Sequence, residues 1–321
     1  MMLCRYIYLR LYHYFKRKGR YTFVGRIVEK LFRRQQVIVY KKKRVQQMPP
    51  KVELANQRTR EFAHKPKISI VVPLYKTPIP YLSHLVQSIQ NQTYQNWELC
   101  LSDGSGNPAL LQEALASYQK DARIHVVVSK EALKIAENTN QAITLATGDY
   151  VAFADHDDAL AENALFECVA AINENPSIDL LYSDEDKMLA NGKEFLQPFE
   201  KPDFDLDYLR TTNYICHLMV VKRELLDQVG WLRPGFDGAQ DYDLVLRLVE
   251  EAKQVHHIPK VLYHWRLHKG STSGNPANKK YAYFAGARAI NEHYERMGID
   301  AVAEQGDDLG EYKTKHQRRS K

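Results

Sequence analysis

The stretch Tyr150-Val151-Ala152-Phe153-Ala154-Asp155-His156-Asp157-Asp158 contains the pattern that decides the fold and the site of this chain. The apolar run predicts a buried strand, and three carboxylates follow it within four residues. Carboxylates this close repel one another, so placing them together is costly unless a cation binds there. A hard divalent ion such as Mg²⁺ or Mn²⁺ prefers these oxygen ligands and often keeps substrate phosphates in its shell. The alternative is a solvated acidic turn that caps the next helix.

The neighbouring sequence favours the metal–diphosphate site, because strands and helices alternate from residue 67 onward. Apolar and β-branched runs predict strands over 68–74, 97–102, 124–128, 150–154 and 179–182. Helical spacing predicts helices over 78–91, 107–120, 136–147 and 160–173. Right-handed crossovers then give an α/β fold, a Rossmann-like and mostly parallel sheet flanked by helices.

Acidic residues follow several of these strands. Asp103 comes after the second strand, Asp155–Asp158 after the fourth and Ser183–Asp186 after the fifth. Ligands bind at the carboxyl ends of the strands in open sheets of this kind. The three acidic stretches together therefore predict one site at one edge of the sheet.

The pattern is less regular after residue 187. We expect a strand within 214–221, a helix over 222–229, a Gly-rich turn at 235–239 before a helix near 240, strand structure over 255–265 and a helix over 277–297. Residues 66–298 form the expected catalytic domain. The polar tail over 299–321 is expected to be disordered.

The N-terminal arm, residues 1–65, differs from the rest in charge. Residues 1–48 contain 14 Lys and Arg and a single acid, Glu29, whereas the remaining chain contains 31 basic and 38 acidic residues. Such an arm suits an anionic surface. Apolar residues over 23–32 recur at helical spacing, which predicts a helix that lies in a membrane interface or packs on the protein itself. Both alternatives stay open, and Met48-Pro49-Pro50 predicts a linker.

Composition excludes several classes of protein. The four cysteines have no paired spacing, which argues against a zinc site and a disulfide framework and favours a reducing compartment. No apolar run approaches the roughly 18 residues needed to span a bilayer. The basic N-terminus lacks the continuous apolar segment of a secretory signal.

The order and spacing of several short motifs resemble the nucleotide-sugar transferases of glycosyltransferase family 2, which have the GT-A fold. The resemblance covers roughly residues 66–298 and is closest to the bacterial subgroup that builds surface polysaccharides. Its motifs are Val71–Tyr75, Leu101–Ser105, Ala146–Asp158, Tyr182–Lys187, Gly238–Leu244 and Leu262–Arg266. Each motif alone is weak, but the set in this order is specific.

The resemblance implies roles for individual residues. The loop with Pro73 and Tyr75 binds the nucleotide, and Asp103 accepts a hydrogen bond from the ring N–H of the base. Asp155 binds the ribose, Asp157 binds Mn²⁺ or Mg²⁺, and Asp241 is the general base. On spacing alone, Asp103 is also explained as a turn residue and Asp241 as a residue at a helix start.

Further residues are candidates for the donor or the acceptor. The resemblance implies that His264 completes the metal shell and that Arg266 contacts phosphate; His264 also suits a purely structural role. Candidates for sugar or acceptor contacts are Asp158, which also buttresses the loop, Asp184, Glu185, Asp186, Gln240 and Trp265. A solvated acidic loop explains residues 184–186 nearly as well.

The leading hypothesis is an inverting, metal-dependent glycosyltransferase that uses a UDP- or dTDP-sugar and acts on a lipid-linked glycan. It would be cytoplasmic, held on the inner face of the cell membrane by residues 1–48. A nucleotidyltransferase would need a Gly-rich phosphate loop, which residues 73–77 lack. A nucleic-acid-binding protein would leave the acidic residues unexplained, so no nucleic-acid partner is expected.

Overall fold

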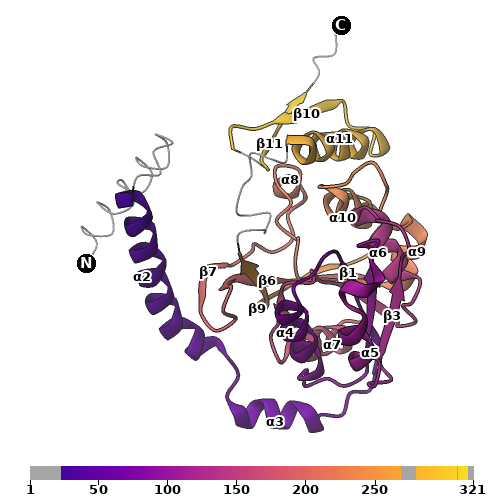
Figure 1. The fold of residues 1–321 in the computed structure, drawn as a ribbon. Helices are drawn as coiled ribbons and strands as arrows, with labels where there is room; N and C mark the ends of the chain where they lie inside the picture. The colour runs from indigo at the N-terminus through magenta and orange to yellow at the C-terminus, as the bar shows by residue number, and fades with distance from the viewer. Residues whose placement is uncertain (1–22, 269–279, 309, 317–321) are drawn as a thin grey trace, which may run out of the picture.

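A central sheet with helices on both faces forms the body of the protein (Figure 1). The structure is a computed structural model that describes residues 23–268, 280–308 and 310–316. The sheet has the order β3-β2-β1-β4-β8-β6-β9-β5. Strand β7 pairs with β6 beyond the end of β8, on the edge opposite β9. Its strands are β1 (Ile68–Leu74), β2 (Trp97–Asp103), β3 (Ile124–Val128), β4 (Tyr150–Phe153), β5 (Ala159–Leu160), β6 (Leu180–Leu189), β7 (Phe195–Phe199), β8 (Met219–Lys222) and β9 (Val255–Leu267).

The first half of the sheet is parallel and the second half is mixed. Strands β3, β2, β1 and β4 run parallel, as do β6 and β9. Strand β8 runs antiparallel to β4 and β6, and β5 and β7 are antiparallel to their partners. The α/β fold is thus confirmed, but the sheet is less uniformly parallel than expected.

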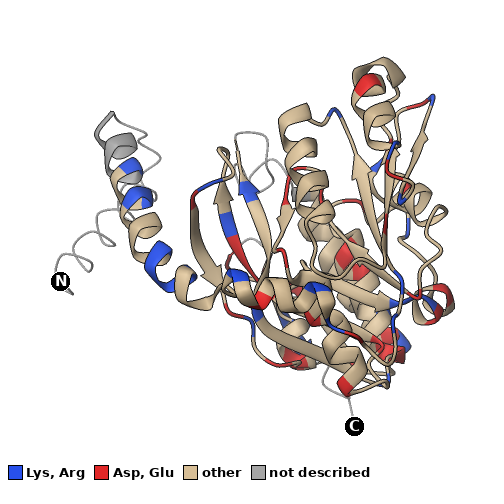
Figure 2. Ribbon diagram, turned by 90° about the horizontal axis from the view of Figure 1, so that it is seen from below, with Lys and Arg blue, Asp and Glu red and all other residues tan. Residues whose placement is uncertain are grey.

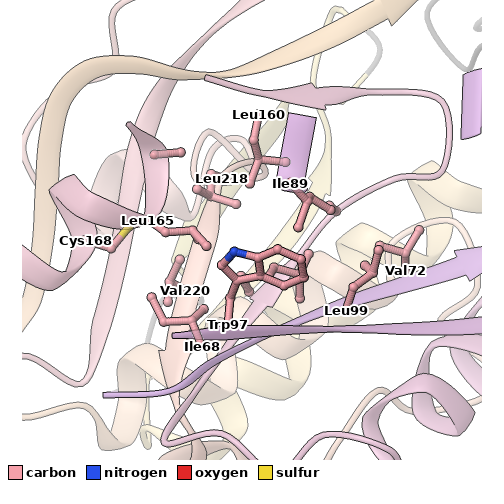
Figure 3. Close-up of a cluster of buried hydrophobic side chains, with 14 of the residues drawn as sticks. Ile68, Val72, Ile89, Trp97, Leu99, Leu160, Leu165, Cys168, Leu218 and Val220 are labelled. Atoms are coloured by element: carbon pink, nitrogen blue, oxygen red, sulfur yellow. The ribbon is translucent and has the colours of Figure 1, made fainter. Parts of the chain in front are cut away.

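Two hydrophobic cores, one on each face of the sheet, hold the layers together. Alternate residues of β1 point to opposite faces, so Ile68 and Val72 enter one core and Val71 the other. The first core, around Trp97, packs against α4 (Ile79–Gln90), α5 (Gln112–Tyr118) and α7 (Ala164–Glu174), as Figure 3 shows in part. The second packs against α6 (Ile135–Ile143), α9 (Arg223–Val229), α10 (Gln240–Glu251) and α11 (Lys280–Arg296). The short helix α8 (Leu206–Leu209) buries Leu209 there.

The basic arm is helical and touches the body only in part. Helix α2 (Phe23–Gln47) packs against β7 near its C-terminal end, and its N-terminal end stands clear of the sheet (Figure 1). Residues 48–50 separate it from α3 (Lys51–Thr59), as the linker prediction requires. Within the described residues, no helix is both long and apolar enough to cross a bilayer.

Two sequence predictions are wrong here. Strand β6 extends to Leu189, so residues 183–186 lie inside a strand and not in a loop after it. The tail from residue 299 contains a hairpin of β10 (Ala301–Gln305) and β11 (Tyr312–His316). The hairpin is ordered because Ala303 and Tyr312 are buried in the second core, which a composition rich in polar residues does not reveal.

A buried carboxylate ties three elements together at the amino end of the sheet. Glu98 on β2 is 1% exposed; it accepts hydrogen bonds from Ser69 Oγ (2.6 Å) and Thr147 Oγ1 (3.0 Å) and forms an ion pair with Lys67. Burial alone would raise its pKa, but these donors outweigh burial and lower the pKa to about 2.

We expect Glu98→Gln to remove part of the pH dependence of stability. Because the folded-state pKa lies below its ordinary value of 4.5, Glu98 stabilises the fold above that pH, and the contribution is lost as the pH falls toward 2. The free energy of unfolding at pH 7 should fall by about 3 kcal/mol and the acid-side slope should flatten, as measured by urea titration. The exposed Glu113→Gln is the control; equal behaviour of the two variants contradicts the assignment.

Candidate active site

Asp103 lies fully buried at the carboxyl end of β2, beside the end of β1. Its Oδ1 accepts a hydrogen bond from the Ser105 amide (3.0 Å), whereas its Oδ2 is buried and has no hydrogen-bond partner among the described residues. Thr77 Oγ1, in the loop that follows Pro73 and Tyr75, is buried and unpartnered in the same sense. Buried polar atoms normally find partners, so these two atoms indicate a ligand with polar groups of its own.

Gly104 makes this corner possible. A Cβ at Gly104 would lie 2.6 Å from the Asn138 side chain, which itself donates to the Leu74 carbonyl (2.9 Å). The glycine therefore lets α6 approach the ends of β1 and β2. The turn interpretation of Asp103 and its interpretation as a ligand-binding residue are both compatible with this geometry.

Buried hydrogen bonds of Asp158 hold the acidic loop after β4 in place. Asp158 is fully buried; its Oδ1 accepts from the Arg266 amide and its Oδ2 from the Tyr263 hydroxyl, both at 2.7 Å. Burial raises its pKa well above the usual range, and the nearby Asp155 and Asp157 add to this effect. Both oxygens are used, which contradicts the prediction that Asp158 contacts sugar or acceptor and fits its predicted role as a buttress.

Asp155 and Asp157 point away from this anchor. The Asp155 side chain is 44% exposed, and its Oδ2 lies 3.4 Å from His217 Nε2. Asp157 Oδ2 lies 2.6 Å from Nε2 of His268, the residue that directly follows β9. In this arrangement the two groups bond directly to each other. A carboxylate oxygen and an imidazole nitrogen are also donor types that Mn²⁺ accepts, so both residues are candidates for a divalent ion.

His264 lies among structural contacts. Its Nδ1 is hydrogen-bonded to Asp186 Oδ1 (2.6 Å), its Nε2 lies 3.4 Å from Arg44 of the arm, and its ring packs edge-on against Phe195. These contacts favour the structural role that the sequence also allowed, and they give no support to the predicted metal role. Strand β9 extends to Leu267, two residues beyond the predicted strand, so the histidine at its carboxyl end is His268.

Arg266 is also buried, and its contacts support the structure around the acidic loop. It is 1% exposed; its guanidinium donates to the carbonyls of Asp157 and Ala190 and to His84 Nδ1 (2.6 Å), and it lies over the Tyr81 ring. Because the side chain is buried and three of its five N–H donors bond to protein groups, the predicted contact with phosphate is not supported. Its contact with Asp157 instead shapes the acidic loop.

The acidic residues of β6 are occupied by protein partners. Asp184 accepts from the Lys201 amide and from His257, and Asp186 accepts from Tyr40 and pairs with His264 and Arg44. Glu185 Oε2 lies 3.2 Å from Lys201 Nζ. All three are nearly inaccessible, so the predicted sugar or acceptor contacts of Asp184 and Asp186 are contradicted. The solvated-loop alternative is contradicted as well.

Asp241, in the first turn of α10, is held by a side chain from another segment. Asn213 Nδ2 donates to Asp241 Oδ2 at 3.0 Å. Burial raises the pKa of Asp241, and the proximity of His217 opposes that rise. Asp243, two residues further along α10, is buried in ion pairs with Arg233 and Arg247. Gln240 accepts a hydrogen bond from the Gly238 amide (2.6 Å), which orders the turn before the helix.

His217 links the two halves of the site, and none of the sequence motifs indicated it. Its ring stacks on Tyr263 at 4.7 Å and lies edge-on to Trp265 at 6.3 Å. Burial lowers its pKa, but the neighbouring Cys216 and Asp155 outweigh burial and raise it well above the usual value. Lys201 fixes this segment, because its Nζ donates to the carbonyls of Ile215 and His217. Asp155 lies against His217, and Asp241 Oδ2 lies 4.0 Å from Sγ of the adjacent Cys216, so this segment connects the two carboxylates.

Residues 69–230 match the family model described as "Glycosyl transferase family 2". The chain belongs to glycosyltransferase family 2. This membership decides against the nucleotidyltransferase and nucleic-acid-binding alternatives. The chain is 37% identical over 254 residues to the O-antigen biosynthesis protein RfbC of Myxococcus xanthus, a match that covers 79% of this chain and 20% of that protein. The chain spans 20–27% of the length of the curated relatives that it matches first.

Two solved structures have the same fold. One is TarS of S. aureus in complex with UDP-GlcNAc, with a TM-score of 0.59 and 20% identity over 71% of this chain and 66% of that one. The other is the mannosyltransferase PcManGT of Pyrobaculum calidifontis in complex with GDP-Man and Mn²⁺, with a TM-score of 0.53 and 18% identity over 84% and 74% of the two chains. These similarities confirm the GT-A fold.

We expect His268→Gln and His264→Gln to separate the two histidines. His268→Gln should weaken Mn²⁺ binding in the presence of UDP by roughly tenfold or more, because it removes a nitrogen ligand beside Asp157. His264→Gln should leave that affinity unchanged and lower the melting temperature, because it removes the bond to Asp186. Calorimetric titration with Mn²⁺ and thermal unfolding distinguish them, and the reverse pattern would restore His264 as the ligand.

Proposed function

We propose that this family 2 domain is an inverting, metal-dependent glycosyltransferase that moves a sugar from a nucleoside-diphosphate donor to a hydroxyl of a glycan. One observation carries the proposal: Asp155, from the end of β4, and Asp241, from the start of α10, both contact the segment Cys216–His217, with His217 Nε2 3.4 Å from Asp155 Oδ2 and Cys216 Sγ 4.0 Å from Asp241 Oδ2. A carboxylate that could act as the general base therefore lies near carboxylates that could bind the sugar donor.

The donor would bind along the carboxyl ends of β1, β2 and β4. Asp103 Oδ2 would accept the ring N–H of uracil or thymine, which would satisfy a buried acceptor that now lacks a partner. Asp155 would accept from the ribose hydroxyls, since its side chain is partly exposed beside the loop of Pro73 and Tyr75. A UDP- or dTDP-linked sugar fits these contacts, and the binding of UDP-GlcNAc by TarS is consistent with the choice.

Asp157 and His268 would hold Mn²⁺ or Mg²⁺. The described residues contain no cluster of three or more His, Cys, Asp and Glu arranged for an ion, so the remaining ligands would be donor phosphates and waters, as is usual for these metals. When bound, the ion would neutralise charge that develops on the departing diphosphate. Arg266 and Asp158 keep the Asp157 loop in place for this task.

Asp241 would take the proton of the acceptor hydroxyl while that oxygen attacks the anomeric carbon. The C–O bond to the diphosphate breaks as the new bond forms on the opposite face, which inverts the configuration. Asn213 orients the carboxylate through its 3.0 Å hydrogen bond. Gln240 and Trp265 remain candidates for acceptor or sugar contacts, because both are partly accessible beside this residue and His217. Glu185 would act indirectly, because its ion pair with Lys201 supports the segment that carries His217.

The acceptor would be a lipid-linked glycan in cell-surface polysaccharide synthesis. The similarity to an O-antigen biosynthesis protein supports this choice. We also propose that the enzyme works on the cytoplasmic side of the cell membrane, where nucleotide sugars and lipid-linked acceptors meet.

We expect Asp241→Asn to suppress transfer while donor binding is preserved. Loss of a general base should lower kcat by roughly 10²–10⁴-fold. Because burial raises the pKa of Asp241, the rate of the unaltered enzyme should fall as the pH drops through that raised pKa and level off above it. The measurement is transfer from UDP- and dTDP-sugars in Mn²⁺ across pH, with donor affinity by calorimetry. Unimpaired transfer by Asp241→Asn would remove it as the base.

We expect Asp103→Asn to weaken UDP and dTDP binding in the absence of metal. The amide would present a donor where an acceptor is needed, so affinity should fall by roughly tenfold or more. The buried neighbour Ser102→Ala is the matched control, because it alters the same strand without facing the base in this proposal. Unchanged nucleotide affinity in Asp103→Asn would place the base elsewhere.

A further inference from the structure

The two faces of helix α2 have different surroundings. The sequence alone left open whether this helix packs on the protein or lies in a membrane interface. The inner face packs on the body through Val37 and Tyr40, which are 8% and 5% exposed. Tyr40 donates to Asp186 Oδ2 at 2.9 Å, and Arg44 lies over the Phe195 ring at 3.6 Å. Gln36 accepts from Gln197 of β7 at 3.2 Å. The helix is therefore fixed to the sheet along this face.

The outer face carries a stripe of apolar side chains that none of the described elements covers. Leu31, Ile38 and Val45 are 54%, 56% and 67% exposed. They are seven residues apart, so they lie on one side of the helix, spaced by about two turns and about 21 Å from first to last. An angle of about 100° per residue places this stripe roughly opposite Tyr40. The two faces thus do not compete for the same side chains.

Basic residues flank the stripe, and no acid does. Arg34 and Lys41 lie one turn from the apolar residues on one side, and Lys42 lies on the other; all three are exposed. Residues 30–52 contain eight Lys and Arg and no Asp or Glu. In Figure 2 the coloured part of α2 shows several blue bands, whereas the body shows both blue and red.

This combination selects one kind of partner. A second copy packed on the same stripe would bring like charges together without a compensating acid, which is unfavourable. Nucleic acid would match the charges but not the apolar stripe. An anionic bilayer matches both: apolar side chains enter the interface while the flanking amines and guanidinium groups reach the headgroups.

We propose that the outer face of α2, formed by Leu31, Ile38 and Val45 with Arg34, Lys41 and Lys42, docks on an anionic lipid bilayer. The inner face keeps the helix fixed to β6 and β7, so docking holds the catalytic body at a set orientation to the membrane. The inference deepens the proposed function and rests on it only for the lipid-linked acceptor. Lipid binding itself is independent of the reaction.

The test is cosedimentation of the full chain with vesicles of phosphatidylglycerol and phosphatidylcholine, or of phosphatidylcholine alone. Arg34→Gln, Lys41→Gln and Lys42→Gln combined should weaken binding to the anionic vesicles roughly 100-fold, about fivefold per charge. Leu31→Ser, Ile38→Ser and Val45→Ser combined should also weaken it, by roughly tenfold or more, although every charge is kept. The control is Val39→Ser with Val52→Ser, which removes equally exposed apolar groups outside the stripe and should change nothing.

Three outcomes would overturn the proposal. These are unchanged vesicle binding by both triple variants, equal losses in the control variant, or a dimer of the unaltered protein that the triple serine variant converts to monomer in sedimentation velocity. Donor hydrolysis in solution without vesicles is measured on the same variants. Loss of vesicle binding with normal hydrolysis supports the docking face; absent hydrolysis in the unaltered protein would count against the proposed function alone.

Discussion

The site depends on the burial of Asp158. This carboxylate follows directly on the residues that would bind donor and metal, and it is bonded to two groups of β9, the Arg266 amide and the Tyr263 hydroxyl. Since Tyr263 also accepts from the Asp155 amide and stacks on His217, one buried contact fixes the acidic loop, the end of β9 and the segment beside Asp241. Three elements distant in sequence thereby keep a common geometry, which preorganised catalysis requires.

A second set of buried ionic contacts connects this region to the arm. Asp186 on β6 is paired at once with Tyr40, Arg44 and His264. His264 precedes Arg266 by two residues on β9, so the inner face of α2 and the loop of Asp157 contact the same strand. The basic arm is therefore part of the same packed unit as the sheet edge. A position of the arm on a membrane would fix the position of the site.

The sequence predicted correctly wherever the information was local. The strand limits of β1 and β3, the helix breaks at prolines and the placing of Asp103 and Asp155 at strand ends follow from periodicity and from the edge rule for open sheets. It failed where partners came from afar. The end of β9 was set two residues short, which put His264 instead of His268 at the carboxyl end of the strand. Asp184 and Asp186 were given ligand roles because their partners Tyr40, His257 and His264 are remote in sequence.

By itself, the sequence determined the alternation of strands and helices, the acidic end of β4 and the excess of positive charge before residue 49, because hydrophobic periodicity and charge are properties of short segments. Only the tertiary structure decided which carboxylates are accessible, which histidine meets Asp157 and which face of α2 is covered. Those properties depend on burial and on contacts between segments up to 220 residues apart, such as Arg44 with His264, and no local pattern encodes them.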